Sequence, residues 1–238
     1  MKKIMRTFSA ATVVLLATTN LCLAQYDTPR EYEPTEIRAI SAGLSMMEFN
    51  PKTANAESDS IGIRFRSLIP LLDFRSGLMD IHFGYTRFSQ NNHMEPAILV
   101  GMNVGTEIPV LGKRSSTLLL PLLIAADFTR ADAEGVARNS FNVASVGIGL
   151  GLKYRITNQS LDAWLSAVAV AHYATQGFSV NAGFSGAILA ELIAYFPAVP
   201  VGDGICVGYR FRFQSWSMPD ANLNYRMILH GPSIGIAF

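Results

Sequence analysis

Large apolar residues alternate with small or charged residues over most of the chain. Between Gly204 and Trp216 every second residue is large and apolar, and Val143 to Thr157 repeats the pattern. A period of two is typical of a β-strand, whose successive side chains point to opposite faces, and it does not fit a helix. Ten strands are predicted in this way, at 39–49, 60–69, 77–89, 96–108, 116–129, 142–157, 162–174, 183–196, 204–216 and 225–238.

The connections between these strands alternate in character along the chain. Four carry turn-forming residues such as Pro70 and Gly112, at 70–76, 109–115, 158–161 and 197–203. The other five are polar, at 50–59, 90–95, 130–141, 175–182 and 217–224. Five loops on one side and four turns on the other are what an up-and-down antiparallel sheet with an even number of strands requires. Both ends of the sheet then fall on the turn side.

The two faces of the predicted strands differ in an unusual way. The smaller face carries Gly, Ala and Ser, interrupted by isolated charges. A closed barrel in lipid explains this, because only helices and closed barrels satisfy every backbone hydrogen bond where water is absent. We therefore predict an all-β fold, a closed antiparallel up-and-down transmembrane β-barrel over 39–238 with about ten strands, between eight and twelve. The larger, outward face is expected to include Ile61, Ile63, Phe65, Ile81, Phe83, Val100, Met102, Val104, Ile188, Leu192, Ile234 and Ile236.

Aromatic residues near the strand ends of the outward face predict two girdles at the membrane interfaces. On the turn side these are Tyr154, Phe196 and Phe238. On the loop side they are Phe49, Tyr85, Phe128, Phe184 and Phe213.

The charged residues of the smaller face are the candidates for function. They are expected to line the lumen as a network of Arg64, Arg66, Asp80, Glu107, Asp127, Lys153, Arg155, Glu191, Arg210 and Arg212. Buried charges must be paired or cost several kcal/mol, and mixed signs suit ion pairs. Arg64 or Arg66 with Asp80, and Arg210 or Arg212 with Glu191, are possible pairs. Such pairs either fill the lumen, as in most small barrels, or form a charged constriction in a narrow channel.

The first 24 residues are typical of a secretory signal peptide. Three cations precede an apolar stretch at 8–17, and small residues favour cleavage between Ala24 and Gln25. The apolar stretch is short for a permanent membrane helix. The residue before Cys22 is large, which does not suit acylation of that cysteine as a lipoprotein. Residues 25–38 are then expected to be a periplasmic tail.

Composition narrows the class of protein further. Half of the residues are apolar and 16% are charged, against about 25% charged in a soluble domain, which argues against a disordered chain. The formal net charge is +1, and it becomes −2 when the three cations of the signal peptide are removed. The charge therefore gives no indication of a positively charged surface that binds nucleic acid. Only Cys206 remains after cleavage, so we expect no intramolecular disulfide and no cysteine-rich zinc site. No phosphate-binding loop, H-E-x-x-H or EF-hand motif occurs in the sequence, and we expect no metal and no cofactor.

The last predicted strand ends with Ile234, Ile236 and Phe238 on one face. It resembles the closing strand of bacterial outer-membrane barrels, where a terminal aromatic residue after alternating apolar ones is the assembly signal. The chain is similar in size and cleavage junction to small barrels of the OmpA-like or porin-like kind. The resemblance implies export through the periplasm and insertion into outer-membrane lipid by the barrel-assembly machinery. We expect a monomer.

No catalytic arrangement stands out in the sequence. The acids and histidines of the polar loops, such as His93, Glu95 and Asp132, do not resemble the paired acids and His–Asp pair of outer-membrane proteases. No motif marks a serine as the nucleophile of a lipid-modifying enzyme. We therefore expect a non-enzymatic outer-membrane barrel with a structural or narrow passive-channel role. The alternative is a surface adhesion or ligand-binding barrel that acts through loops 50–59, 130–141 and 217–224.

Overall fold

The computed structural model describes residues 37–52, 62–77, 79–113, 115–133, 140–176, 182–197, 202–219 and 224–238. The predicted signal peptide at 1–24, its cleavage site between Ala24 and Gln25, and nearly all of the predicted tail lie outside these residues. No helix within the described ranges is long and apolar enough to cross a membrane.

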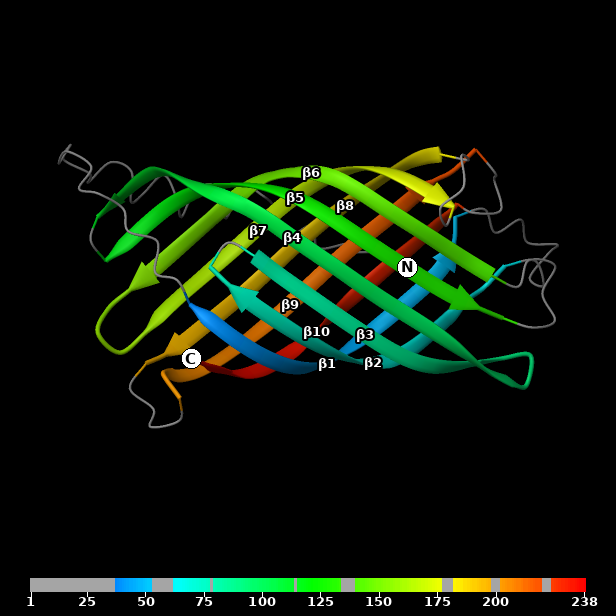
Figure 1. Ribbon diagram of the computed structural model, residues 1–238, viewed down its shortest axis with the longest axis horizontal. Helices are drawn as coiled ribbons and strands as arrows, with labels where there is room; N and C mark the ends of the chain where they lie inside the picture. The colour runs from blue at the N-terminus through cyan, green and yellow to red at the C-terminus, as the bar shows by residue number, and fades with distance from the viewer. Residues whose placement is uncertain are drawn as a thin grey trace, which may run out of the picture. The chain divides into compact units, whose positions relative to one another are not determined.

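The described residues form one closed β-barrel (Figure 1). Each strand pairs antiparallel with the strand that follows it in sequence, and β1 pairs with β10 to close the wall. This confirms the predicted all-β, closed up-and-down barrel of ten strands. The strands are β1 (Arg38–Pro51), β2 (Phe65–Ser76), β3 (Met79–Gln90), β4 (His93–Lys113), β5 (Ser116–Asp132), β6 (Ser140–Thr157), β7 (Asp162–Gln176), β8 (Ala182–Phe196), β9 (Gly204–Ser217) and β10 (Tyr225–Ala237).

The two ends of the barrel differ in their connections, as the sequence predicts. The turn side, on the left of Figure 1, holds the β2–β3, β4–β5, β6–β7 and β8–β9 connections together with the C-terminus. The loop side, on the right, holds the other five connections. Asn91 and Asn92 both have positive φ and make a tight connection between β3 and β4, which asparagine tolerates better than most residues.

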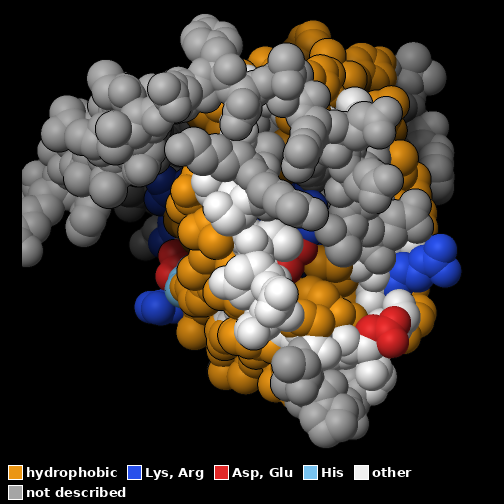
Figure 2. All heavy atoms as spheres, turned by 90° about the vertical axis from the view of Figure 1, so that its left-hand side faces the viewer, with side chains coloured by type: hydrophobic (Ala, Val, Ile, Leu, Met, Phe, Trp, Pro, Cys, Tyr) orange, Lys and Arg blue, Asp and Glu red, His pale blue; other side chains and the backbone are white. Residues whose placement is uncertain are grey.

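Apolar side chains cover the outside of the barrel wall. Ile148 is 72% exposed and Phe184 is 73% exposed, and the view from the turn side shows hydrophobic side chains over much of the wall (Figure 2). Ile234, Ile236 and Phe238 of the last strand also point outward. Apolar surface of this extent is unfavourable in water and suits the hydrocarbon of a bilayer.

Strand β2 differs from the prediction in both its position and its facing. The sequence predicts this strand at 60–69 and a turn at 70–76 that begins with Pro70. In the structure Pro70 lies within the strand opposite Leu44, and the turn follows at Gly77, which has positive φ. Ile63 and Phe65 were predicted to point outward and are buried inside the barrel.

Phe49, which was predicted for the outer girdle, is also buried inside the barrel. These errors in facing share one physical cause. At the loop side the lumen is filled by apolar and aromatic side chains, so apolar residues point inward there and charged residues such as Arg66 point outward.

Candidate functional site: the packed lumen

The lumen is filled by layers of side chains that follow one another along the barrel axis. The inward residues of β9 sample these layers in order from the turn side to the loop side: Cys206, Arg210, Arg212, Gln214 and Trp216. The turn-side end is apolar, two ionic layers follow, and the loop-side end is aromatic. Alternation along the strands brings each of these side chains inward.

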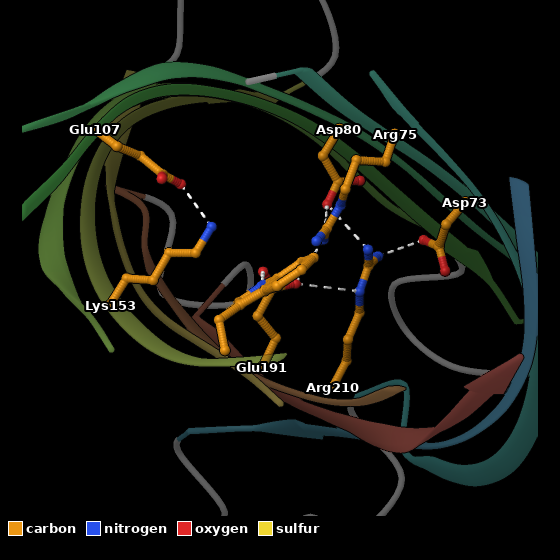
Figure 3. Close-up of polar contacts among 8 residues, drawn as sticks. Asp73, Arg75, Asp80, Glu107, Lys153, Glu191 and Arg210 are labelled. Atoms are coloured by element: carbon orange, nitrogen blue, oxygen red, sulfur yellow. Dashed lines mark hydrogen bonds and ion pairs between the residues drawn. The ribbon is translucent and has the colours of Figure 1, made fainter. Parts of the chain in front are cut away.

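The first ionic layer joins opposite walls of the barrel (Figure 3). Arg75 on β2 donates to Glu191 on β8 at 2.7 Å and contacts Asp80 at 3.3 Å. Arg210 on β9 contacts Asp80 on β3 at 3.0 Å and also pairs with Asp73. Going around the wall, β2 and β8 are four strands apart, as are β3 and β9. The side chains therefore cross the lumen rather than line it.

Two more ion pairs lie close to the turn side. Lys153 Nζ is 2.7 Å from Glu107 Oε1, and it also lies 4.5 Å from the centre of the Trp164 ring, within cation–π range. Arg155 donates from Nε to Asp162 at 2.8 Å, where both side chains are buried. The Trp164 indole N–H donates to Glu191 at 3.0 Å, which connects the Lys153–Glu107 pair to the first ionic layer.

The second ionic layer is centred on Asp127 of β5, which is 7% exposed. Arg212 of β9 lies 2.6 Å from Asp127 Oδ2 and 3.0 Å from His82 Nε2. His172 Nε2 is 3.1 Å from the same carboxylate oxygen. Gly101 faces this layer, and a Cβ there would lie 2.2 Å from His82 and 2.6 Å from Asp127, so the layer needs a glycine at this position.

An aromatic layer closes the loop-side end of the lumen. Phe49 of β1 and Phe141 of β6 come from opposite walls, and their ring centroids are 5.0 Å apart. Trp216 and Tyr225 contact Phe141 at 5.1 Å and 4.9 Å, and Phe65 continues the layer beside Phe49. Phe49, Phe141 and Trp216 are fully buried. The rings therefore meet across the whole width of the barrel.

The structure separates the predicted lumen residues into two groups. Asp80, Glu107, Asp127, Lys153, Arg155, Glu191, Arg210 and Arg212 all lie inside the barrel in ion pairs. Arg64 and Arg66 point outward instead, which corrects their assignment to the lumen. They cannot pair with Asp80, whose partners are Arg75 and Arg210, and Arg66 contacts Glu48 on the outside at 3.2 Å.

Sequence reasoning missed several members of the network. The predicted turn at 70–76 includes Asp73 and Arg75 because Pro70 suggests the end of a strand, although their alternation with Leu72 and Phe74 marks them as inward strand residues. The partners Asp162, His172 and Gln214 also alternate with outward residues, yet which charges they meet depends on the stagger between strands. Within the described ranges, no cluster of three or more His, Cys, Asp or Glu side chains is placed to hold a metal ion.

Comparison with known proteins finds similar barrels among solved structures, at low identity. No family model and no curated protein matches the chain. Among solved structures, the outer membrane protease OmpT from Escherichia coli has a TM-score of 0.39 and 9% identity, over 88% of this chain and 99% of that one. Neisserial surface protein A has a TM-score of 0.33 and 13% identity, over 84% and 97% of the two chains.

The outer membrane phospholipase A from Escherichia coli is a further match, with a TM-score of 0.26 and 12% identity over 88% of this chain and 94% of that one. Because a protease and a phospholipase are among these barrels, the expectation of a non-enzymatic protein is corrected. Such low identity assigns no activity and excludes none. In fold, the chain is similar to small bacterial outer-membrane β-barrels.

Proposed function

We propose that this protein is an integral outer-membrane β-barrel with a closed lumen and a structural role, and that it presents its loops at the cell surface. Two features support placement in a bilayer. The wall is closed, so no strand edge is left along the seam between β1 and β10, and the outside is apolar along most strands. The predicted export signal and closing-strand motif agree with the outer membrane as the location.

The contact between Phe49 and Phe141 carries the proposal of a closed lumen. These two rings come from opposite walls and meet in the lumen, where their centroids are 5.0 Å apart, and Trp216 packs against both of them. An ion would have to pass this apolar layer and then two layers of charged side chains that already pair with one another. An aqueous path through these layers would require breaking buried ion pairs, which is strongly unfavourable.

The ionic layers suit a structural role because they connect strands that are distant around the wall. Arg212 joins β9 to β5, and Arg75 joins β2 to β8. A barrel braced in this way holds the ends of its strands in fixed positions and thereby supports the loops. The surface-binding alternative involves loops 50–59, 130–141 and 217–224, whose central residues lie outside the described part of the chain, so it stays a prediction.

Planar-bilayer recording tests the closed lumen. We expect no single-channel steps above the background of protein-free bilayers, and the same result for Arg210→Glu because no current exists whose ion selectivity could change. A shift between heated and unheated samples on gels shows separately that the protein in the preparation is a folded barrel. Reproducible conductance steps from folded protein, altered by Arg210→Glu, would establish the channel instead.

A further inference from the structure

A tyrosine and a histidine form a hydrogen-bonded pair on the outside of the barrel wall. Tyr209 of β9 and His230 of β10 both point outward, and the Tyr209 hydroxyl lies 2.8 Å from Nδ1 of His230. In the wall, β10 lies between β9 and β1 (Figure 1). Exposed apolar residues such as Phe211 and Ile234 surround the pair on these strands. The pair therefore interrupts an apolar stretch of the outer face.

The pair lies near the middle of both strands. Tyr209 is the sixth of the 14 residues of β9, and His230 is the sixth of the 13 residues of β10. The neighbouring outward positions on the two strands are all apolar: Val207, Phe211, Ile228 and Pro232. With the barrel in a bilayer, as proposed above, the middle of a strand lies in hydrocarbon, where polar side chains are costly unless they find partners.

The bond between the two side chains leaves one donor and one acceptor unused. If the Tyr209 hydroxyl donates to Nδ1, the proton of the neutral His230 ring is on Nε2, which is a free donor, and the Tyr209 oxygen keeps a free lone pair. If Nδ1 carries the proton and donates it, Nε2 is a free acceptor and the Tyr209 hydroxyl is a free donor. Within the described ranges, these two side chains hydrogen-bond only to each other. Both tautomers therefore expose one donor and one acceptor on the same patch.

We propose that this patch is the interface of a homodimer, in which Tyr209 and His230 of one copy hydrogen-bond to His230 and Tyr209 of a second copy. The inference rests on the proposed placement of the barrel in a bilayer. A two-fold axis brings each residue of such a pair to the symmetry mate of the other, so a patch with one donor and one acceptor complements itself. The dimer replaces the monomer that we expect from the sequence.

A second copy fits this patch better than lipid does. Acyl chains offer no hydrogen-bonding groups, and headgroups lie toward the ends of the strands. When the two-fold axis runs parallel to the barrel axis, both copies keep the same orientation in the bilayer and present their pairs at the same depth. Association in lipid depends on close packing and on hydrogen bonds between chains. Exposed apolar side chains beside the pair supply the packing surface: Leu44, Leu192, Phe211 and Ile234.

Sedimentation equilibrium of the full chain in density-matched detergent micelles tests the dimer. We expect a monomer–dimer equilibrium whose dimer fraction rises with the ratio of protein to micelles. Tyr209→Phe and His230→Phe should each weaken the dimer about tenfold or more, because each substitution breaks both bonds between the copies. Tyr173→Phe is the matched control and should leave the dimer unchanged, because Tyr173 is a 57% exposed tyrosine near the loop-side end of β7, away from the patch.

Several results would overturn the interface. Folded protein that is monomeric at every ratio, or that forms assemblies larger than a dimer, contradicts a closed two-fold contact. A dimer that neither Tyr209→Phe nor His230→Phe weakens, or that Tyr173→Phe weakens equally, does not depend on this pair.

Photo-cross-linking in membranes of cells that express the full chain identifies the occupant of the patch. With p-benzoylphenylalanine in place of Phe211, irradiation should give a product of twice the mass of the chain. The same substitution at Ile148, which is 72% exposed on β6, should not. Equal yields at the two positions would show random collision. A product that contains lipid alone, or a different protein, would assign the patch to that occupant and overturn the dimer.

The outcomes separate this inference from the proposed function. Protein that shows the gel shift of a folded barrel but is monomeric in micelles refutes only the dimer. Protein that folds neither in micelles nor in lipid vesicles refutes the proposed membrane location, and the interface with it.

Discussion

Removal of Arg212 tests whether the second ionic layer holds opposite walls together. In Arg212→Met the side-chain length is similar but the positive charge is lost. Asp127 is 7% exposed and loses the partner that lies 2.6 Å away, and Gln214 loses the guanidinium that donates to its Oε1 at 3.1 Å. The carboxylate then keeps the contacts with the two histidines, His82 and His172.

The size of the effect follows from burial. Removing one partner of a buried ion pair typically costs about 3–5 kcal/mol, because an uncompensated charge is left behind. An exposed pair contributes about 0–1 kcal/mol. Arg66 and Glu48 form such a pair on the outer surface, with 68% of the Arg66 side chain exposed. Arg66→Met is therefore the control, with an expected loss below about 1 kcal/mol.

The assay is urea unfolding of the barrel in lipid vesicles, followed by the fluorescence of Trp164 and Trp216, which lie inside the barrel. Arg212→Met should lower the free energy of unfolding by about 3–5 kcal/mol. The double variant Arg212→Met, Asp127→Asn removes both charges and should recover most of this loss, giving a large coupling energy between the two positions. Arg212→Lys keeps the charge and should lie between wild type and Arg212→Met.

Two results would refute the reasoning. If Arg212→Met is no more destabilising than Arg66→Met, the buried pair does not stabilise the barrel. If the double variant loses as much as the two single variants together, Arg212 and Asp127 act independently.

Two further predictions concern packing and assembly. Gly101→Ala should lower the free energy of unfolding by about 1–3 kcal/mol, because the new Cβ would lie 2.2 Å from His82. Gly186→Ala is the control and should leave the free energy of unfolding unchanged, because nothing lies within 4 Å of the new Cβ. Equal urea midpoints for both variants would contradict the packing of the second ionic layer. Phe238→Ala should reduce the amount of barrel assembled in outer-membrane fractions of cells. It should not change the urea midpoint of purified protein, because Phe238 points outward and is 53% exposed. Normal assembly would show that the terminal aromatic residue is not the assembly signal.

The errors on β2 and β1 show where sequence reasoning fails in a membrane barrel. The rule that apolar residues point outward and charged residues inward holds on the turn-side part of the wall, as for Ile81 and Asp80. At the loop side the lumen holds aromatic rings, and there Phe65 points in and Arg66 points out. Nothing in the local alternation of Ile63, Arg64, Phe65 and Arg66 marks this reversal.

Proline was a second source of error. Pro70 suggests a turn because it cannot donate a backbone hydrogen bond, and this moved the predicted strand toward the N-terminus. In the barrel, Pro70 instead lies beside the place where the β2–β3 ladder ends. Proline is thus tolerated within this strand because it lies where no β3 partner needs its N–H. Only the pairing of the neighbouring strands reveals that position.

The period of two, a count of about ten strands and the alternation of loops and turns all follow from the residue pattern, and together they predict the closed antiparallel barrel that the structure shows. These properties depend on the order of residues along each strand, which any reader of the chain can see. The tertiary structure alone decided that Arg212 meets Asp127, that Arg75 meets Glu191 and that Phe49 meets Phe141 across the lumen. The reason is geometric: partners four or five strands apart are selected by strand tilt and stagger, which are properties of the closed wall and not of any single strand.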